Sequence, residues 1–434
     1  MMSMTSTEDQ ASPERSPSPQ DPPPRATDAW SRRIRLPVSL AAAGILTLYN
    51  VAFATHWGQV TGWVDGYWAN FWLISYSDGY ERRALLGSVI RFFFSDPISY
   101  VTVNVIGVTF ATGVVASIYY LFFKRISDNR NWLLIFVVMV SGPATTVFYE
   151  TVGDPMHVAF ALVIVYAFVA RRLGEKLSGI FALVTAILAV LTHEASVFLL
   201  LPGIYLIHSL SAGKPPRFMV LLPIMAVLVL GIVLLLNKQD ATSDNFAMVA
   251  SDSTLVHPAD DALPSLSDLL LEQAAIHFSS PKGPFRMVLK LLAVLLWPTL
   301  VLLGAGHILK TKANFKIFLF LLLPSLPLYA IGEDWGRFVV QTLMMSILAF
   351  ATVPRERKVE MATVIDKLSG LLFRLTRSLF SAAPAILLLL LVFHSYRHYR
   401  IKGLLTQDVL LAVTAWGAFV AYHLSSSRKR LTDK

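Results

Sequence analysis

Long apolar runs separated by short polar segments make up most of the chain from residue 36 onward. A helix that crosses the hydrocarbon core of a bilayer needs about 20 predominantly apolar residues. The runs therefore predict membrane helices at residues 36–55, 98–122, 132–148, 156–170, 178–193, 195–209, 218–236, 288–308, 317–332, 338–353, 379–394 and 407–424. Two pairs of short runs, 178–193 with 195–209 and 317–332 with 338–353, could instead form tight helical hairpins. We expect an all-α, polytopic integral membrane bundle of about 10–12 transmembrane helices.

The segments outside these runs differ in character. Residues 1–29 are rich in Pro and polar residues without apolar periodicity, which is typical of a disordered tail. Residues 56–97 mix aromatic and charged residues and predict an ordered external loop with interfacial helices. Residues 237–287 predict an external loop that could cover a site, and 359–378 predict a cytoplasmic amphipathic helix. One transmembrane domain, 30–434, contains all of these segments except the tail.

The composition excludes several classes of protein. Of the 434 residues, 55% are hydrophobic and 15% are charged, whereas soluble domains average about 45–50% and about 25%. An ordinary soluble globular protein is therefore excluded. The chain has no cysteine, which excludes disulfides, thiolate metal sites and cysteine nucleophiles. It also lacks a Walker A sequence, which argues against an ATP-driven pump.

The net charge of +9 comes from short clusters of Lys and Arg between apolar runs. Such clusters act as topology signals because positively charged short loops are retained in the cytoplasm, so no nucleic-acid partner is expected. Placing the N-terminus inside puts most of the 37 Lys and Arg residues on the cytoplasmic side. We expect a multi-pass protein of the bacterial cytoplasmic (inner) membrane with both termini in the cytoplasm.

Four short polar motifs interrupt the apolar pattern, and the predicted topology places all of them on the external side. They are SYSDGYERRALLG with Asp78, Glu81, Arg82 and Arg83, FYETVGDPMH with Glu150, Asp154 and His157, LTHEAS with His193 and Glu194, and IGEDWGRF with Asp334 and Arg337. A charged residue at the membrane centre costs about 2.5–3.5 kcal/mol on insertion scales and is kept for a reason. Basic residues that oppose the topology rule are good candidates for binding a ligand.

Adjacent arginines at positions 82 and 83 suit a phosphate or pyrophosphate, because each guanidinium presents planar bidentate donors. Asp78 then lies near enough in sequence to act as a general base. Each motif also has a structural interpretation: ion pairs within a helix for the first and fourth, a polar turn before a helix that opens at Pro155 for the second, and a hairpin tip for the third.

Metal binding is a further possibility for the second and third motifs. Asp154, His157, His193 and Glu194 could together bind a divalent metal, although no segment has a ligand spacing such as HExxH. We therefore assign no metal ligand and expect no cofactor.

The long first external loop with an acidic residue, followed by many spans and the strings DGYERR, GDPMH, THEAS and EDWGR, resembles polytopic glycosyltransferases of the GT-C type and the related polysaccharide polymerases. The resemblance implies a sugar donor linked to polyprenyl phosphate or diphosphate, and a glycan, lipid or protein acceptor at the external membrane face. It also implies that an acidic residue of the first loop activates the acceptor hydroxyl. Asp78 occupies the matching loop, and Asp65 is a second candidate.

On this hypothesis the donor enters from the membrane lipids and its phosphate binds Arg82, Arg83 and Arg337, while Asp78 is the catalytic base. The other predicted substrate contacts are Glu81, Glu150, Asp154, His157, His193, Glu194 and Asp334. Two other classes stay open: a transporter or flippase of an anionic lipid-linked substrate, and a non-catalytic membrane assembly subunit. A transporter should hold its substrate residues near the membrane midplane, whereas these motifs lie near the ends of spans.

Overall fold

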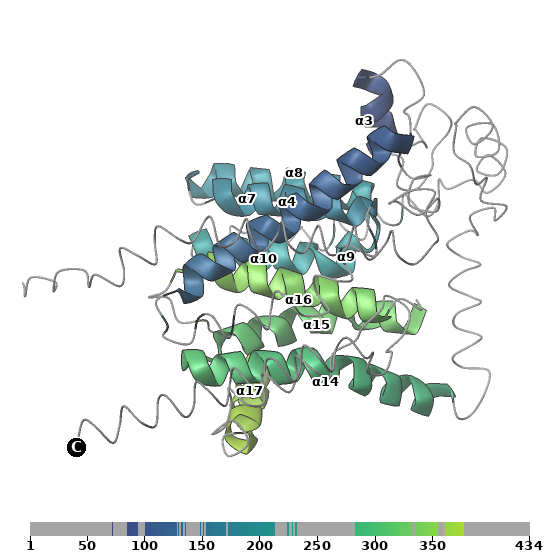
Figure 1. The fold of residues 1–434 in the computed structure, drawn as a ribbon. Coiled ribbons are helices and arrows are strands. Elements are labelled where there is room, and N and C mark those ends of the chain that lie inside the picture. The colour runs from purple at the N-terminus through teal and green to yellow at the C-terminus, as the bar shows by residue number, and fades with distance from the viewer. Residues whose placement is uncertain are drawn as a thin grey trace, which may run out of the picture.

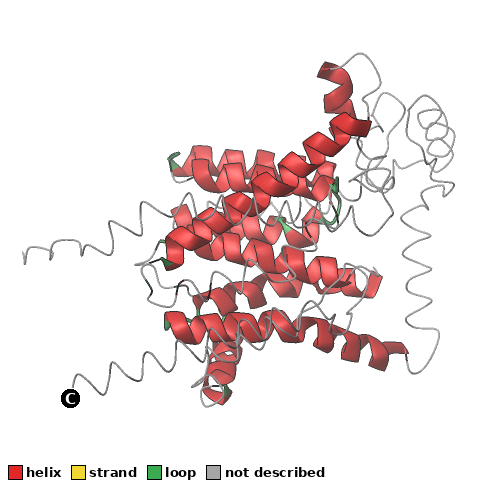
Figure 2. Cartoon of the chain, viewed as in Figure 1, coloured by secondary structure: helices red, strands yellow, loops and turns green. Residues whose placement is uncertain are grey.

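The computed structural model describes the helical core of the chain. The described residues are 85–93, 100–127, 153–170, 172–212, 283–331, 335–354 and 361–376, together with positions 72, 129, 132, 135, 148, 151, 224, 228, 231 and 359. All regular elements in this part of the chain are helices (Figure 2). They are α3 (Leu85–Phe93), α4 (Tyr100–Ile126), α7 (Pro155–Val169), α8 (Glu175–Thr192), α9 (Ser196–Leu199), α10 (Leu201–Ala212), α14 (Gly283–Leu309), α15 (Ala313–Ile331), α16 (Trp335–Thr352) and α17 (Thr363–Leu375).

Three of these helices are long and apolar enough to cross a membrane. They are the segment Thr102–Ile126 of α4, helix α8 and helix α16. Shorter apolar stretches occupy α7, the segment that contains α9 and α10, and parts of α14 and α15. The prediction of an all-α membrane helical protein is therefore confirmed.

The described helices lie close to the predicted apolar runs. Helix α8, for example, occupies Glu175–Thr192, and a run was predicted at 178–193. The run at 195–209 is divided into α9 and α10 next to Pro202, whose missing N–H interrupts the helical hydrogen bonds. The runs at 36–55, 379–394 and 407–424 and the segment 1–29 lie outside the described residues, as do most of the runs 132–148 and 218–236 and most of the segments 56–97 and 237–287.

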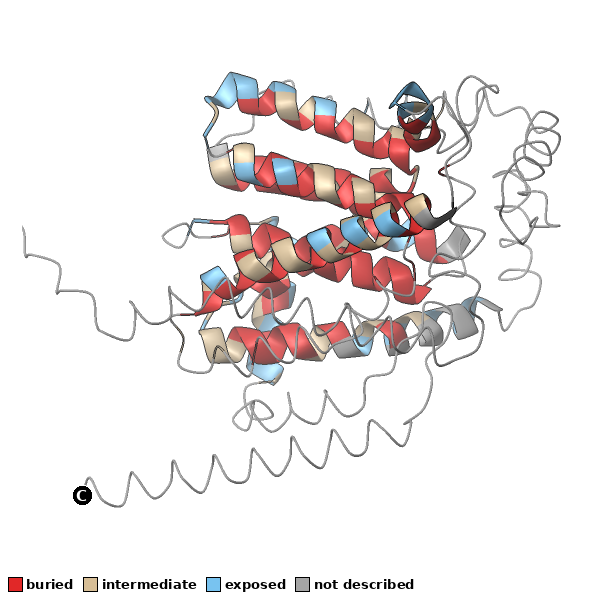
Figure 3. Cartoon of the chain, turned by 45° about the horizontal axis from the view of Figure 1, so that its top comes forward, coloured by how far each residue is buried: buried red, intermediate tan, exposed pale blue. Residues whose placement is uncertain are grey.

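Most of the long helices lie side by side with their axes roughly aligned, α4 crosses them obliquely, and α17 lies crosswise to α14 (Figure 1). Helix α16 is at the centre, where it packs against α4, α9, α10, α14 and α15 and is almost entirely buried. The outer helices bury one side and expose the other (Figure 3). Large apolar side chains such as Val165, Phe168 and Val184 are exposed on these outer sides, as expected of surfaces that face lipid.

The two ends of the bundle differ in charge. We call the end where α7 and α16 begin and α8 ends the site end. At the opposite end α4, α7, α10 and α16 finish, α8 and α15 begin, and α17 packs. Basic residues gather at this opposite end: Lys124, Arg125, Arg172, Lys176, Lys310, Lys312, Lys316, Lys367 and Arg374.

Candidate functional site

The start of α7 positions the first acidic residue of the site. Gly153 has φ of 92°, a conformation that favours glycine, and Pro155 occupies the first turn of the helix. Asp154 is the N-cap residue, and its Oδ1 accepts a hydrogen bond from the Met156 amide at 2.9 Å. The indole N–H of Trp72 donates to the Gly153 carbonyl oxygen at 2.6 Å. These contacts fix the direction of the Asp154 carboxylate. Capping α7 is one structural reason for an aspartate at this position.

The second oxygen of that carboxylate pairs with the first turn of α16. Arg337 Nη1 lies 3.3 Å from Asp154 Oδ2, although 183 residues separate the two in the sequence. The Asp154 side chain has no exposed surface and that of Arg337 is 9% exposed. The predicted local pairing of Arg337 with Asp334 lies outside the described residues, and the described partner of Arg337 is on another helix.

The environment keeps Asp154 ionised. Burial by itself would raise the pKa of Asp154, because the charged form loses its hydration. The positive Arg337, then His193, His157 and the Met156 amide, act in the other direction, and together they hold the pKa of Asp154 below its ordinary value. A carboxylate with a lowered pKa and a bound cation is a weak proton acceptor, so Asp154 is better suited to orienting Arg337 than to general base catalysis.

The segment between α8 and α9 adds an imidazole and a second carboxylate. His193 follows the last residue of α8, and its Nε2 lies 3.7 Å from Asp154 Oδ1. The Ala195 amide donates to His193 Nδ1 at 3.2 Å, so in the neutral ring the proton is on Nε2 and faces Asp154. Glu194 Oε2 lies 3.6 Å from His193 Nδ1, and the Glu194 side chain is 11% exposed.

His157 lies beside this group, in the first turn of α7. Its Nε2 is 3.5 Å from Thr151 Oγ1, and its ring stacks on Phe148 with centroids 4.9 Å apart. Its Nδ1 is buried without a hydrogen-bond partner among the described residues. An unpaired polar atom in such a position is unusual and is expected to be satisfied by water or by a ligand.

The structure thus brings five of the predicted site residues together at one end of the bundle: Asp154, His157, His193, Glu194 and Arg337. We call this group the α7–α16 cluster. The other predicted residues, Asp78, Glu81, Arg82, Arg83, Glu150 and Asp334, lie outside the described residues. Within the described part of the chain, no group of three or more His, Cys, Asp or Glu side chains has the arrangement of a metal site.

The sequence analysis missed several supporting contacts. Trp72, Phe148 and Thr151 hold the start of α7, and only their position in or near polar motifs could have marked them. At the opposite end, His208 Nδ1 lies 2.8 Å from the Tyr166 hydroxyl and 3.3 Å from Ser178 Oγ, joining α10, α7 and α8. A histidine inside an apolar run was the available signal for this second group.

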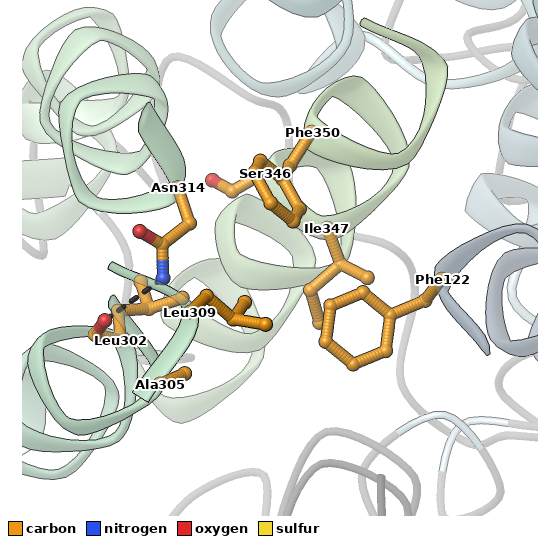
Figure 4. A pocket seen from close by; sticks show the side chains of 8 residues that line it. All are labelled: Phe122, Leu302, Ala305, Leu309, Asn314, Ser346, Ile347 and Phe350. Atoms are coloured by element: carbon orange, nitrogen blue, oxygen red, sulfur yellow. Dashed lines mark hydrogen bonds between the residues drawn. The ribbon is translucent and has the colours of Figure 1, made fainter. Parts of the chain in front are cut away.

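A small cavity lies between α4, α14, α15 and α16, away from the α7–α16 cluster (Figure 4). Its lining is mostly apolar, with Asn314 and Ser346 as the polar side chains. The Asn314 amide donates to the Leu302 carbonyl oxygen at 2.8 Å. With a volume of about 10 Å³ the cavity has room for one water at most, so it is not a substrate site.

Comparison with known proteins identifies a family for the chain. A family model described as "Uncharacterised membrane protein Rv1490" matches residues 40–277, which is more than half of the chain. The matched region contains the α7, α8 and α9 contributions to the cluster but ends before Arg337. No curated protein and no solved structure matches the chain.

Proposed function

Since the chain belongs to the Rv1490 family of membrane proteins, its chemistry has to be argued from its own polar residues, and we propose that it is a membrane glycosyltransferase. On this proposal it moves a sugar from a polyprenyl phosphate or diphosphate donor to a hydroxyl group of a glycan, lipid or protein acceptor. The reaction takes place at the site end of the bundle, which the charge distribution predicts to be external.

The observation that carries the proposal is the convergence of charged and polar side chains at the site end. The cluster has contributions from α7, the α8–α9 junction and α16, and the Asp154–Arg337 pair joins α16 to the start of α7. A buried ion pair is weak evidence for stability, because desolvation offsets much of its Coulomb energy. Burying charged groups in a membrane bundle costs free energy, and we interpret their presence here as functional.

The cluster by itself has too little positive charge to bind a phosphate. The two carboxylates of the cluster, Asp154 and Glu194, outnumber its one arginine, Arg337. A donor phosphate therefore requires further cations, and Arg82 and Arg83 of the first loop are the candidates. Arg337, oriented by Asp154, would contact the same phosphate and stabilise the charge that develops on the leaving group.

The acceptor is assigned to the less buried side of the cluster. Glu194 is the more exposed of the two carboxylates, and it lies next to His193. The Glu194 carboxylate can accept hydrogen bonds from sugar hydroxyls, and His193 lies beside it and helps to orient it, so we assign this pair to positioning the acceptor or the transferred sugar. Asp78 remains the proposed base, since the lowered pKa of Asp154 makes that residue unsuitable.

The test compares glycans of source cells that lack the protein with those of complemented cells. Null cells are complemented with wild type, Asp78→Asn, Glu194→Gln or Glu175→Gln, at matched membrane abundance. Glu175→Gln is the control, because Glu175 is exposed in the first turn of α8 at the opposite end. Mass spectrometry should show that null cells accumulate an unglycosylated acceptor and that wild type and Glu175→Gln restore the product. Asp78→Asn and Glu194→Gln should fail to restore it.

Other results would favour other functions. An unchanged glycan profile in null cells would refute the transferase. A flippase would be indicated by two results together. Null cells would lose the product although purified protein cannot make it from a polyprenyl-linked donor, and the protein would move that donor across the membrane of proteoliposomes. Full restoration by both Asp78→Asn and Glu194→Gln would instead support an assembly subunit.

A further inference from the structure

Helix α17 has three distinct faces. At about 100° per residue, one face holds Ile365, Ser369 and Phe373, which are buried against the bundle. A second face is apolar but exposed, and a third carries exposed basic residues. Such a division is expected of a helix that contacts protein, lipid and headgroups at once.

The buried face attaches α17 firmly to the bundle. The Phe373 ring stacks on His307 of α14 with centroids 4.7 Å apart, and lies 6.4 Å from Phe315 of α15. Lys316 Nζ pairs with Asp366 Oδ1 at 2.6 Å. These contacts orient α17 on the bundle and define the directions of its other faces.

The apolar face is a stripe of four side chains that the described protein leaves uncovered. Val364 is 75% exposed, Leu368 42%, Leu371 45% and Leu375 65%. Their spacing of four, three and four residues places them along one line of the helix. Because α17 lies crosswise to α14 at the end of the bundle (Figure 1), this line runs in the plane of a membrane that the bundle crosses.

The basic face lies beside the stripe. Lys367 and Arg374 are exposed, seven residues apart, and pair with no other described residue. Lys310 and Lys312 of the neighbouring turn are exposed at the same end. Basic side chains next to an inserted apolar stripe match the negative surface of a membrane with anionic lipids.

We propose that α17 lies in the membrane interface, with the stripe Val364, Leu368, Leu371 and Leu375 among acyl chains and with Lys367 and Arg374 bound to the headgroups of anionic phospholipids. The helix thereby anchors the end of the bundle opposite the site. This assignment is independent of the proposed glycosyl transfer, and its test requires no activity.

The absence of cysteine allows a direct test, because a single introduced cysteine takes a spin label without background. The full chain is labelled as Leu371→Cys or Lys367→Cys and placed in nanodiscs of phosphatidylcholine, alone or mixed with phosphatidylglycerol. The Leu371→Cys label should collide with oxygen more than with a water-soluble nickel complex. The Lys367→Cys label should show the reverse preference.

A second set of variants tests the headgroups. In the Leu371→Cys background, Lys367→Gln and Arg374→Gln should each lower the ratio of inserted to water-exposed label by about fivefold in anionic nanodiscs. The ratio should stay unchanged in phosphatidylcholine alone. Arg172→Gln with Lys176→Gln, at the same end but away from α17, is the matched control.

Two results would overturn the proposal. If the Leu371→Cys label is water-exposed in both lipids while the protein is folded and monodisperse, the stripe is not inserted in the membrane. A protein partner would then be the better candidate for covering the stripe. If the label is inserted but the two glutamine variants behave as wild type in anionic nanodiscs, the headgroup assignment is wrong.

Discussion

The strongest energetic prediction concerns the buried pair of Asp154 and Arg337. Arg337→Gln leaves a carboxylate with no exposed surface and without its main cation. At the observed 3.3 Å, two unit charges interact by about 5 kcal/mol at an effective dielectric constant near 20. Removing one partner of a buried pair costs about 3–5 kcal/mol in measured cases. We therefore expect Arg337→Gln to lower the free energy of unfolding by about 3–5 kcal/mol.

The double variant separates this charge effect from general damage. Asp154→Asn with Arg337→Gln removes both charges and retains hydrogen-bonding groups of similar size. We expect the double variant to lose less stability than the sum of the two single variants, with a coupling energy of about 2–3 kcal/mol. Glu194→Gln is the control, since its carboxylate is more exposed and should cost less than about 1 kcal/mol.

The assay is equilibrium unfolding of purified protein in mixed micelles with increasing SDS, followed by circular dichroism and tryptophan fluorescence. All four chains of the cycle are compared at one pH and one ionic strength. A coupling energy below about 0.5 kcal/mol, the range of independent sites, would refute the reasoning. It would mean that solvent or other groups neutralise Asp154 as well as Arg337 does.

Three further predictions use the same unfolding assay. Gly306→Ala should cost about 1–3 kcal/mol, because a Cβ there would lie 2.6 Å from Phe373 Cζ and 2.7 Å from a backbone oxygen, whereas Gly113→Ala, with open space around it, should change stability by less than about 1 kcal/mol. Lys310→Gly should add about 1 kcal/mol, because Lys310 has φ of 54°, and a loss of stability there would contradict this interpretation. The folded-state pKa of Asp154 is lowered, so the ionised carboxylate contributes fully to folding stability above its ordinary pKa of 3.8, and this contribution is lost as the pH falls below that value. Wild type should therefore lose stability in that range more steeply than the Asp154→Asn variant.

The helices could be predicted from hydropathy because each long helix keeps a continuous apolar run. Helix α4 occupies Tyr100–Ile126 and was predicted at 98–122. The break between α9 and α10 was harder to predict, because Pro202 in an apolar run can open a helix, kink it or end it. Which spans face lipid was not predicted either. In retrospect Gln341, Thr342 and Ser346 mark α16 as a buried span.

The sequence could place the motifs at one end but could not pair their side chains. Alternating spans put the starts of α7 and α16 and the end of α8 on the same side, which follows from counting. That Arg337 meets Asp154 depends on α16 packing at the centre of the bundle, and no local pattern encodes this arrangement. The capping role of Asp154 was visible in the sequence as Asp followed by Pro155.

The pairing within the cluster also limits which residue can perform proton transfer. Asp154 is bound to Arg337 on one oxygen and caps α7 with the other, so protonating it would weaken both contacts. His193 Nδ1 accepts a hydrogen bond from the Ala195 amide, and its Nε2 faces Asp154. Neither nitrogen can therefore take a proton from the acceptor substrate without a rearrangement. Glu194 is the remaining described carboxylate of the cluster, and it is partly exposed. On the proposed glycosyl transfer, Glu194 and the first-loop residue Asp78 are therefore the two carboxylates to compare as the base. Comparing the pH dependence of glycosyl transfer in Glu194→Gln and Asp78→Asn proteins should distinguish them, because only loss of the base removes the acidic limb of the profile.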